Sequence, residues 1–215
     1  MIDIIDIHTH RPDAVAALIS TDPRRFDPQP GKWYSVGFHP WEDVDELTAA
    51  DFGLLEQCAR HPQVLAVGET GMDTLRGASL DIQASVFVRH LQLAHELGKP
   101  VVAHNVRATQ HMLDARRKAS LSDVTLIIHG MRGNVHVARA LLDAGCYLSY
   151  GSRFNPAALL ATPLDRLLIE TDDSDVTITD VASQVAQTLH LTIDEVTKAA
   201  TTNAQHLLMK PDSFN

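Results

Sequence analysis

Short runs of β-branched and aliphatic residues recur along this chain, and segments with helical periodicity separate most of them. The runs show little polar alternation, which is typical of strands buried on both faces of a parallel sheet. Eight such runs lie at residues 2–7, 14–20, 34–38, 64–69, 100–104, 125–129, 146–150 and 166–170. Because strands and helices alternate along the whole length, the pattern predicts one α/β domain over residues 1–215.

Helix signals are clear after the third run and weak before it. The longest predicted helix covers residues 82–97, and Gly98-Lys99-Pro100 ends it. Thr192-Ile193-Asp194-Glu195 has the spacing of a capping box that opens the last helix. Only residues 11–13 separate the first two runs, and residues 21–32 have the composition of an irregular loop. We therefore expect a distorted (β/α)8 TIM barrel with helices missing near the N-terminus; a helix at 14–20 would leave seven strands.

Composition limits where the protein acts and what it binds. The formal net charge of −9 gives no electrostatic support for gripping a phosphate backbone over a broad surface. Cys58 and Cys146 lie far apart without CxxC spacing, which favours reduced thiols. The chain has no basic leader followed by an apolar stretch, and no apolar run approaches ~18 residues. We expect a soluble cytoplasmic protein with no membrane contact and no obligate protein partner.

Residues able to bind metal ions recur where the apolar runs end. In barrel enzymes the active site is assembled from the C-terminal ends of different strands, so such residues converge. A carboxylate there is costly to bury unless it is paired or bound to a metal. The residues concerned, which we predict to be metal ligands, are His8, His10, Glu69, His104, His129 and Asp172.

The size of this donor set indicates two ions. Four imidazoles and two carboxylates exceed the three protein ligands of a typical catalytic zinc, and they suit a pair of ions bridged by a carboxylate. We expect Glu69 to bridge the ions: His8, His10 and Asp172 complete one ligand set, and His104 and His129 complete the other. A divalent ion makes water a nucleophile at neutral pH, which predicts hydrolysis of a phosphoester, amide or ester. Glu69 and Asp172 are the expected catalytic residues, with Asp172 as general base.

The remaining histidines divide into one candidate and seven without assigned chemistry. His39 follows the run 34–38 in the segment Val36–Pro40, directly before a proline. The others lie on predicted helices or in polar loops, where a capping or structural role is the common one; these are His61, His90, His95, His111, His136, His190 and His206.

Seven segments, in order and spacing, carry a resemblance that covers nearly the entire chain. They are Asp6–His10, Val36–Pro40, Ala66–Asp73, Gly98–His104, Ile128-His129-Gly130, Pro163–Asp172 and Thr202-Asn203-Ala204. In these segments the chain resembles the TatD family of metal-dependent deoxyribonucleases. The resemblance implies a distorted TIM barrel that binds one or two divalent metal ions (Mg, Mn or Zn). It also implies that the six predicted ligands occupy the family's ligand positions and that His39 lies near the substrate phosphate.

Departures from the family pattern indicate a compact TatD-like branch with altered substrate walls. The family's usual His-Cys-Phe-Ser-Gly is here His129-Gly130-Met131-Arg132-Gly133, and Arg107 lies one place later than the common arginine. Arg107 and Arg132 are candidates to hold a phosphate oxygen. The expected function is a phosphodiesterase or deoxyribonuclease acting on a DNA end. The alternatives are a small-molecule amide, lactone or phosphoester hydrolase, and a metal-binding scaffold without activity.

Overall fold

The strands of the computed structural model, which describes residues 3–209, follow one another in the order of a closed parallel barrel. Residues 17–21 form a strand, so the eight-strand prediction is confirmed and the seven-strand alternative is wrong. Ile2, with which the first predicted run begins, lies outside the described residues. The strands are β1 (Asp6–Thr9), β2 (Ala17–Thr21), β3 (Trp33–Val36), β4 (Val64–Asp73), β5 (Val101–Val106), β6 (Leu126–Ile128), β7 (Tyr147–Tyr150) and β8 (Leu167–Ile169).

Helices follow the strands from β3 onward. Before β3 the described chain holds a single 3-10 turn, η1 (Pro23–Arg25), which confirms that helices are missing near the N-terminus. The predicted capping box at Thr192 is present, and Gly98 ends the helix Leu80–Leu97 in the left-handed conformation with φ 58°. Among the described helices, none has the length and apolar character needed to cross a membrane. The helices that follow β3 are α1 (Ala49–Ala59), α2 (Leu80–Leu97), α3 (Thr109–Lys118), α4 (Val135–Asp143), α5 (Pro156–Leu160), η2 (Leu164–Arg166), α6 (Ile178–Leu189) and α7 (Ile193–Leu208).

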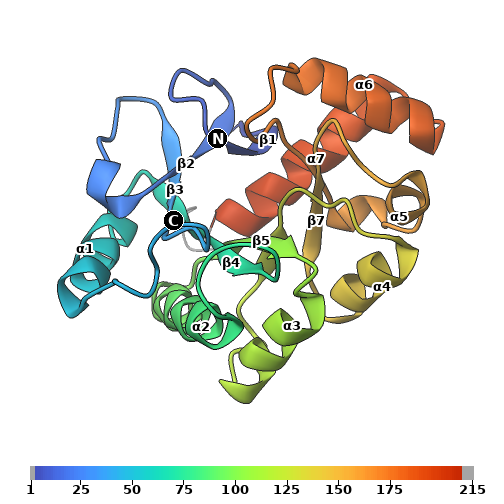
Figure 1. The fold of residues 1–215 in the computed structure, drawn as a ribbon. Coiled ribbons are helices and arrows are strands. Elements are labelled where there is room, and N and C mark those ends of the chain that lie inside the picture. The colour runs from blue at the N-terminus through green and yellow to red at the C-terminus, as the bar shows by residue number, and fades with distance from the viewer. Residues whose placement is uncertain (1–2, 210–215) are drawn as a thin grey trace. The chain divides into compact units, whose positions relative to one another are not determined.

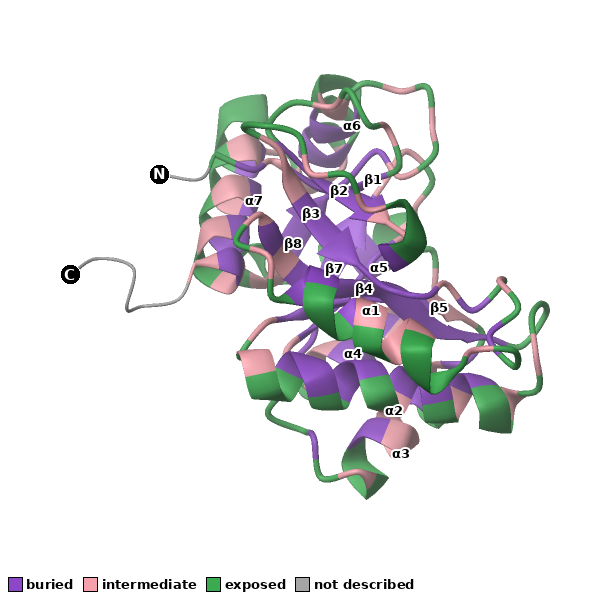
Figure 2. Ribbon diagram, turned by 90° about the vertical axis from the view of Figure 1, so that its left-hand side faces the viewer, coloured by how far each residue is buried: buried purple, intermediate pink, exposed green. Residues whose placement is uncertain are grey.

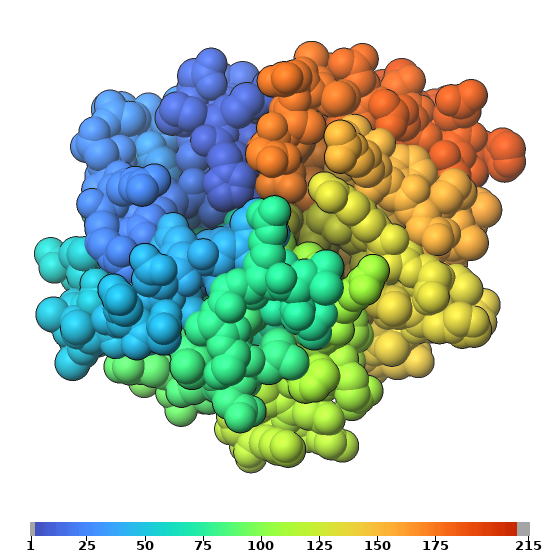
Figure 3. All heavy atoms as spheres, in the orientation of Figure 1, coloured from blue at the N-terminus to red at the C-terminus, as the bar shows by residue number. Residues whose placement is uncertain are grey.

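The chain divides into two compact units, which we call the terminal unit (Met1–Ile19 and Ile128–Asn215) and the central unit (Ser20–Ile127). In the terminal unit β1 pairs with β8, and β8 pairs with β7. Helix α7 packs against both β8 and α6, and Figure 1 shows α7 beside α6. Because β1 pairs with β8, the two ends of the chain also meet at the surface: the dark blue start of the chain lies beside the orange segment near residue 175 (Figure 3).

In the central unit, β3, β4 and β5 form a parallel sheet. Helix α2 packs along β4 and beside α3, while α1 contacts β3 and β4. The strands are buried almost throughout, and the helices alternate between buried and exposed positions along their length (Figure 2). This pattern agrees with strands that read as continuous apolar runs and with helices that carry one apolar face.

Irregular strand pairing occurs at two of the predicted site residues. Three residue steps from Asp6 to Thr9 on β1 face two steps on β2, and His8 lies inside this irregularity. The pairing of β4 with β5 shifts in the same way between Val67 and Thr70, around Glu69. Bulges of this kind redirect side chains and are common next to active sites.

The expectations that the first strand stops before His8 and that the fourth ends at Glu69 are wrong. His8 lies within β1, and β4 continues to Asp73. The reason in β4 is the close approach of β5: a Cβ on Gly71, whose φ is 141°, would overlap the carbonyl oxygen of His104. The glycines that resemble a turn in the sequence therefore allow the two backbones to remain paired.

Candidate metal centre

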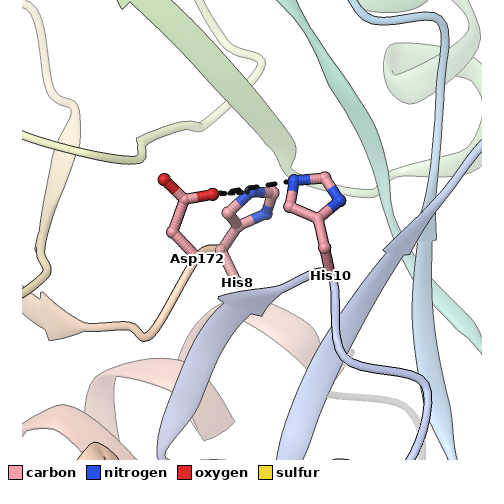
Figure 4. Close-up of side chains that lie close together, drawn as sticks. All are labelled: His8, His10 and Asp172. Atoms are coloured by element: carbon pink, nitrogen blue, oxygen red, sulfur yellow. Dashed lines mark ion pairs between the residues drawn. The ribbon is translucent and has the colours of Figure 1, made fainter. Parts of the chain in front are cut away.

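In the terminal unit, two imidazoles and one carboxylate share a small volume. The Nε2 atoms of His8 and His10 each lie 3.6 Å from Oδ1 of Asp172, and Figure 4 shows both rings directed at this oxygen. His8 is fully buried, whereas the His10 side chain is 45% exposed and that of Asp172 is 19% exposed. The three donor atoms lie within 4.8 Å of one another, which is the spacing that one metal ion requires.

Backbone hydrogen bonds hold this cluster in register. The amide of Asp172 donates to the carbonyl of His8 at 2.9 Å, and the amide of His10 donates to the carbonyl of Asp172 at 3.2 Å. Asp6 supports the same segment, because its carboxylate accepts the Thr171 amide at 3.0 Å and the Thr171 hydroxyl at 2.6 Å. Burial raises the pKa of Asp6 to about 6, although the Thr171 hydrogen bonds offset part of that effect.

A second cluster in the terminal unit contains Glu170, which the sequence analysis did not select. Its Oε1 accepts the Gly130 amide at 2.6 Å and lies 3.6 Å from Nδ1 of His129. Its Oε2 is buried and has no hydrogen-bond partner among the described residues. Glu170, His129 and Asp172 together can supply the donor atoms of a metal site. The available signal was the position of Glu170 at the end of a buried strand, two residues before Asp172.

In the central unit, a buried carboxylate lies between two imidazoles. Oε1 of Glu69, which is 3% exposed, lies 2.9 Å from Nε2 of His39 and 3.1 Å from Nδ1 of His104. The other nitrogen of the His104 ring, Nε2, lies 3.5 Å from Oδ2 of Asp73. A carboxylate behind a histidine orients the ring and raises its basicity, which is the usual support for a metal-binding histidine.

The two histidines of this cluster have different hydrogen-bonding roles. Nδ1 of His39 accepts the Trp41 amide at 3.1 Å, so the neutral ring carries its proton on Nε2 and donates toward Glu69. His39 is therefore arranged as a hydrogen-bond donor, whereas His104 contacts Glu69 through Nδ1 and Asp73 through Nε2. Burial alone would raise the pKa of Asp73, but hydrogen bonds from Leu75, Trp41 and His104 outweigh it and lower the pKa.

The predicted cationic residues follow the strands as expected. Arg107 is exposed directly after β5, and Arg132 is exposed with Nη2 3.9 Å from Oδ2 of Asp172. The unassigned histidines include a purely structural one: His90 is buried, accepts the Phe38 amide at Nε2 and contacts a helix carbonyl at Nδ1. Burial lowers the pKa of His90 to about 4, which keeps the ring neutral.

Within each unit the predicted ligands come together. The terminal unit contains His8, His10, His129 and Asp172, and the central unit contains Glu69 and His104, with His39 against the same carboxylate. The assignment of each residue as a ligand, and of Glu69 as a bridge, stays a prediction.

Comparison with known proteins gives the family. The model of the family described as TatD related DNase matches residues 27–209. The chain belongs to this family. Its relatives include the uncharacterized metal-dependent hydrolase YabD of Bacillus subtilis, which is 31% identical over 194 residues, 80% of this chain and 76% of YabD. A human relative, the 3'-5' RNA nuclease TATDN2, is 32% identical over 151 residues, which are 65% of this chain and 20% of TATDN2.

The solved structure of YjjV, a TatD homologue from Escherichia coli K12, has the same fold. The TM-score is 0.81 at 20% identity, over 98% of this chain and all of that one. The family match and the curated relatives make this TatD-family chain a metal-dependent hydrolase, and the YjjV structure supports its barrel fold. Its clusters of imidazole nitrogens and carboxylate oxygens suit one or two divalent ions, and the unpartnered buried oxygen of Glu170 is where a cation would be favourable.

Proposed function

We propose that this protein is a phosphodiesterase that removes nucleotides from the end of a DNA strand. The observation that carries the proposal is the central cluster, where the buried carboxylate of Glu69 contacts two imidazoles. A carboxylate that is 3% exposed and faces two imidazoles is in surroundings that suit a shared cation. The family description and the name of the human relative both denote cleavage of phosphodiester bonds, which supports this substrate class.

The proposed roles follow from the hydrogen bonding in each unit. His8, His10 and Asp172 would hold one divalent ion, and Glu69 with His104 would hold a second. A divalent ion supplies Lewis-acid activation of water and of a phosphoryl oxygen. Asp172 accepts the proton of the attacking water at a carboxylate oxygen.

Substrate contacts are assigned to residues that can donate hydrogen bonds. Once Glu69 holds a metal ion, His39 would donate from Nε2 to a phosphate oxygen in place of Glu69, because its Nδ1 already accepts the Trp41 amide. Arg107 and Arg132 are exposed guanidinium groups that can hold further phosphate oxygens. With a net charge of −9, the chain would hold a strand end locally through these groups and not along a broad basic surface.

The test is an assay of the metal-reloaded protein on end-labelled single-stranded DNA, with metal content measured on the same samples. Glu69→Gln and His104→Ala are expected to abolish cleavage. Matched controls are Glu56→Gln and His95→Ala, whose side chains form surface ion pairs with Arg60 and Asp123. Intact DNA with the wild-type protein, or equal cleavage by the Glu69 variant, would refute the proposal.

A second candidate is hydrolysis of a small phosphoester, amide or lactone. The net charge of −9 favours it, because a small substrate needs no basic track. A substrate panel that shows turnover of such compounds and none of oligonucleotides would select this alternative.

A further inference from the structure

The indole of Trp41 is held firmly at its edges and is still 47% exposed. Its Nε1–H donates to Oδ2 of Asp73 at 2.6 Å, and this carboxylate is 2% exposed. The ring centroid lies 4.9 Å from that of His39 and 5.1 Å from that of His104. An exposed tryptophan is thus fixed beside both imidazoles that contact Glu69.

The loop after β4 brings an apolar and a cationic side chain to the same place. Leu75 is 61% exposed, and its amide donates to Oδ1 of Asp73 at 2.7 Å. The guanidinium carbon of Arg76 lies 4.6 Å from the centroid of the Trp41 ring. The Asp73 carboxylate therefore holds both parts: Oδ1 accepts the amide of the loop residue Leu75, and Oδ2 accepts the indole N–H of Trp41.

This loop has a backbone that is fixed from inside the protein. The buried side-chain Nε2 of Gln83 lies 3.1, 2.9 and 2.7 Å from the carbonyl oxygens of Asp73, Arg76 and Ala78, which share its two hydrogens. Gly77, with φ 84°, approaches the Pro40 carbonyl so closely that a Cβ would overlap it. The exposed side chains consequently project from a rigid support, as recognition sites do.

We propose that Trp41 and Arg76 form a stacking site for the base of the nucleotide next to the cleaved bond. The proposal rests on the function proposed above and names the part of the substrate that this surface recognises. An aromatic ring binds any base through its π-face, and a guanidinium adds stacking and a charge for the adjoining phosphate. The 4.9 Å between the rings of Trp41 and His39 places the base one nucleotide's reach from the phosphate donor.

The kinetic test compares oligonucleotides with and without a base at the cleaved end. An abasic residue is placed at the terminal or the penultimate position, and kcat/KM is measured with the metal-loaded full chain. For the wild type, one of these positions is expected to lower kcat/KM by on the order of 10-fold, as loss of a stacked base does. Trp41→Ala is expected to remove this difference, and Trp41→Phe, which keeps the ring but not Nε1–H, is expected to retain most of it.

Each other outcome overturns the proposal. Equal cleavage of the abasic and complete strands by the wild type excludes a base site. A difference that survives in Trp41→Ala places the site elsewhere. Loss of the difference in Trp41→Phe as well assigns Trp41 to positioning Asp73 and not to stacking.

A binding test is independent of turnover and of whether the alanine variant folds. The chain has two tryptophans, so Trp33→Phe leaves Trp41 as the sole indole emitter. A deoxynucleoside monophosphate is expected to quench its fluorescence saturably, whereas deoxyribose 5-phosphate is not. The base site is refuted if the nucleotide does not quench the fluorescence, whether or not a small aryl ester quenches it. If the nucleotide quenches the fluorescence but the protein cleaves no DNA, only the proposed function is refuted.

Discussion

Gln83 is expected to contribute more to stability than a typical buried polar residue. Its side chain is 1% exposed, accepts the Asp73 amide at Oε1 and donates from Nε2 to three carbonyls of the loop that follows β4. A hydrogen bond contributes about 1 kcal/mol net, and an unsatisfied buried group costs about 1–3 kcal/mol. Because this side chain accepts one hydrogen bond and donates two hydrogens to the loop carbonyls, Gln83→Ala should lower the free energy of unfolding by about 3 kcal/mol.

Urea denaturation at constant metal concentration measures this loss, with the midpoint and slope fitted together. Gln92→Ala is the matched control, because Gln92 lies exposed on the same helix α2 and should change stability by less than about 0.5 kcal/mol. Gln83→Glu keeps the acceptor and most of the volume but loses the donors, so it should be at least as destabilising as the alanine variant. A loss below about 1 kcal/mol in both variants would refute the argument that this side chain fixes the loop.

Three further predictions concern pH, backbone packing and metal binding. The pKa of His90 is about 4 in the folded state, below its unfolded value of 6.5, so its stabilising contribution is present above pH 6.5 and lost toward pH 4. Relative to His90→Gln, the wild type should therefore lose up to about 3 kcal/mol over that range in urea titrations; parallel pH profiles would contradict this. Gly71→Ala should lower the free energy of unfolding by about 2 kcal/mol or more, because the new methyl group meets the His104 carbonyl. Gly53→Ala, in open space on α1, should leave the stability unchanged or raise it, and thermal denaturation of both variants measures the difference. Asp172→Asn should weaken divalent-ion binding by ~10-fold or more in calorimetric titration, and unchanged affinity would remove Asp172 from the ligand set.

Most of the fold could be predicted from the sequence because buried parallel strands and capped helices leave local signals. The apolar runs located all eight strands, and Thr192 and Gly98 marked a helix start and a helix end that the structure confirms. The misplaced strand ends have a non-local cause. The extension of β4 beyond Glu69 depends on how closely Gly71 approaches β5, and nothing in the segment itself shows that contact.

The site was predictable only where chemistry and strand position coincided. His8 and Asp172 carried both signals, and the structure places their side chains together. Glu170 had the same strand-end position as the selected residues, but Asp172 two residues later offered a second carboxylate, and the sequence gives no ground for choosing both. Gln83 could not have been found, because a single amide on a helix reveals nothing of the loop carbonyls that it bonds in three dimensions.

The internal bonding of the loop after β4 separates two demands that proteins usually have to satisfy together. The backbone of residues 73–78 is held by Gln83 from the interior, and the outward side chains at positions 75 and 76 contribute little to that support. Mutations at these two positions can therefore change what the surface recognises while the fold stays as stable as before. If this loop carries the proposed base site, substrate preference could change under selection beside His39 and His104 without a loss of stability.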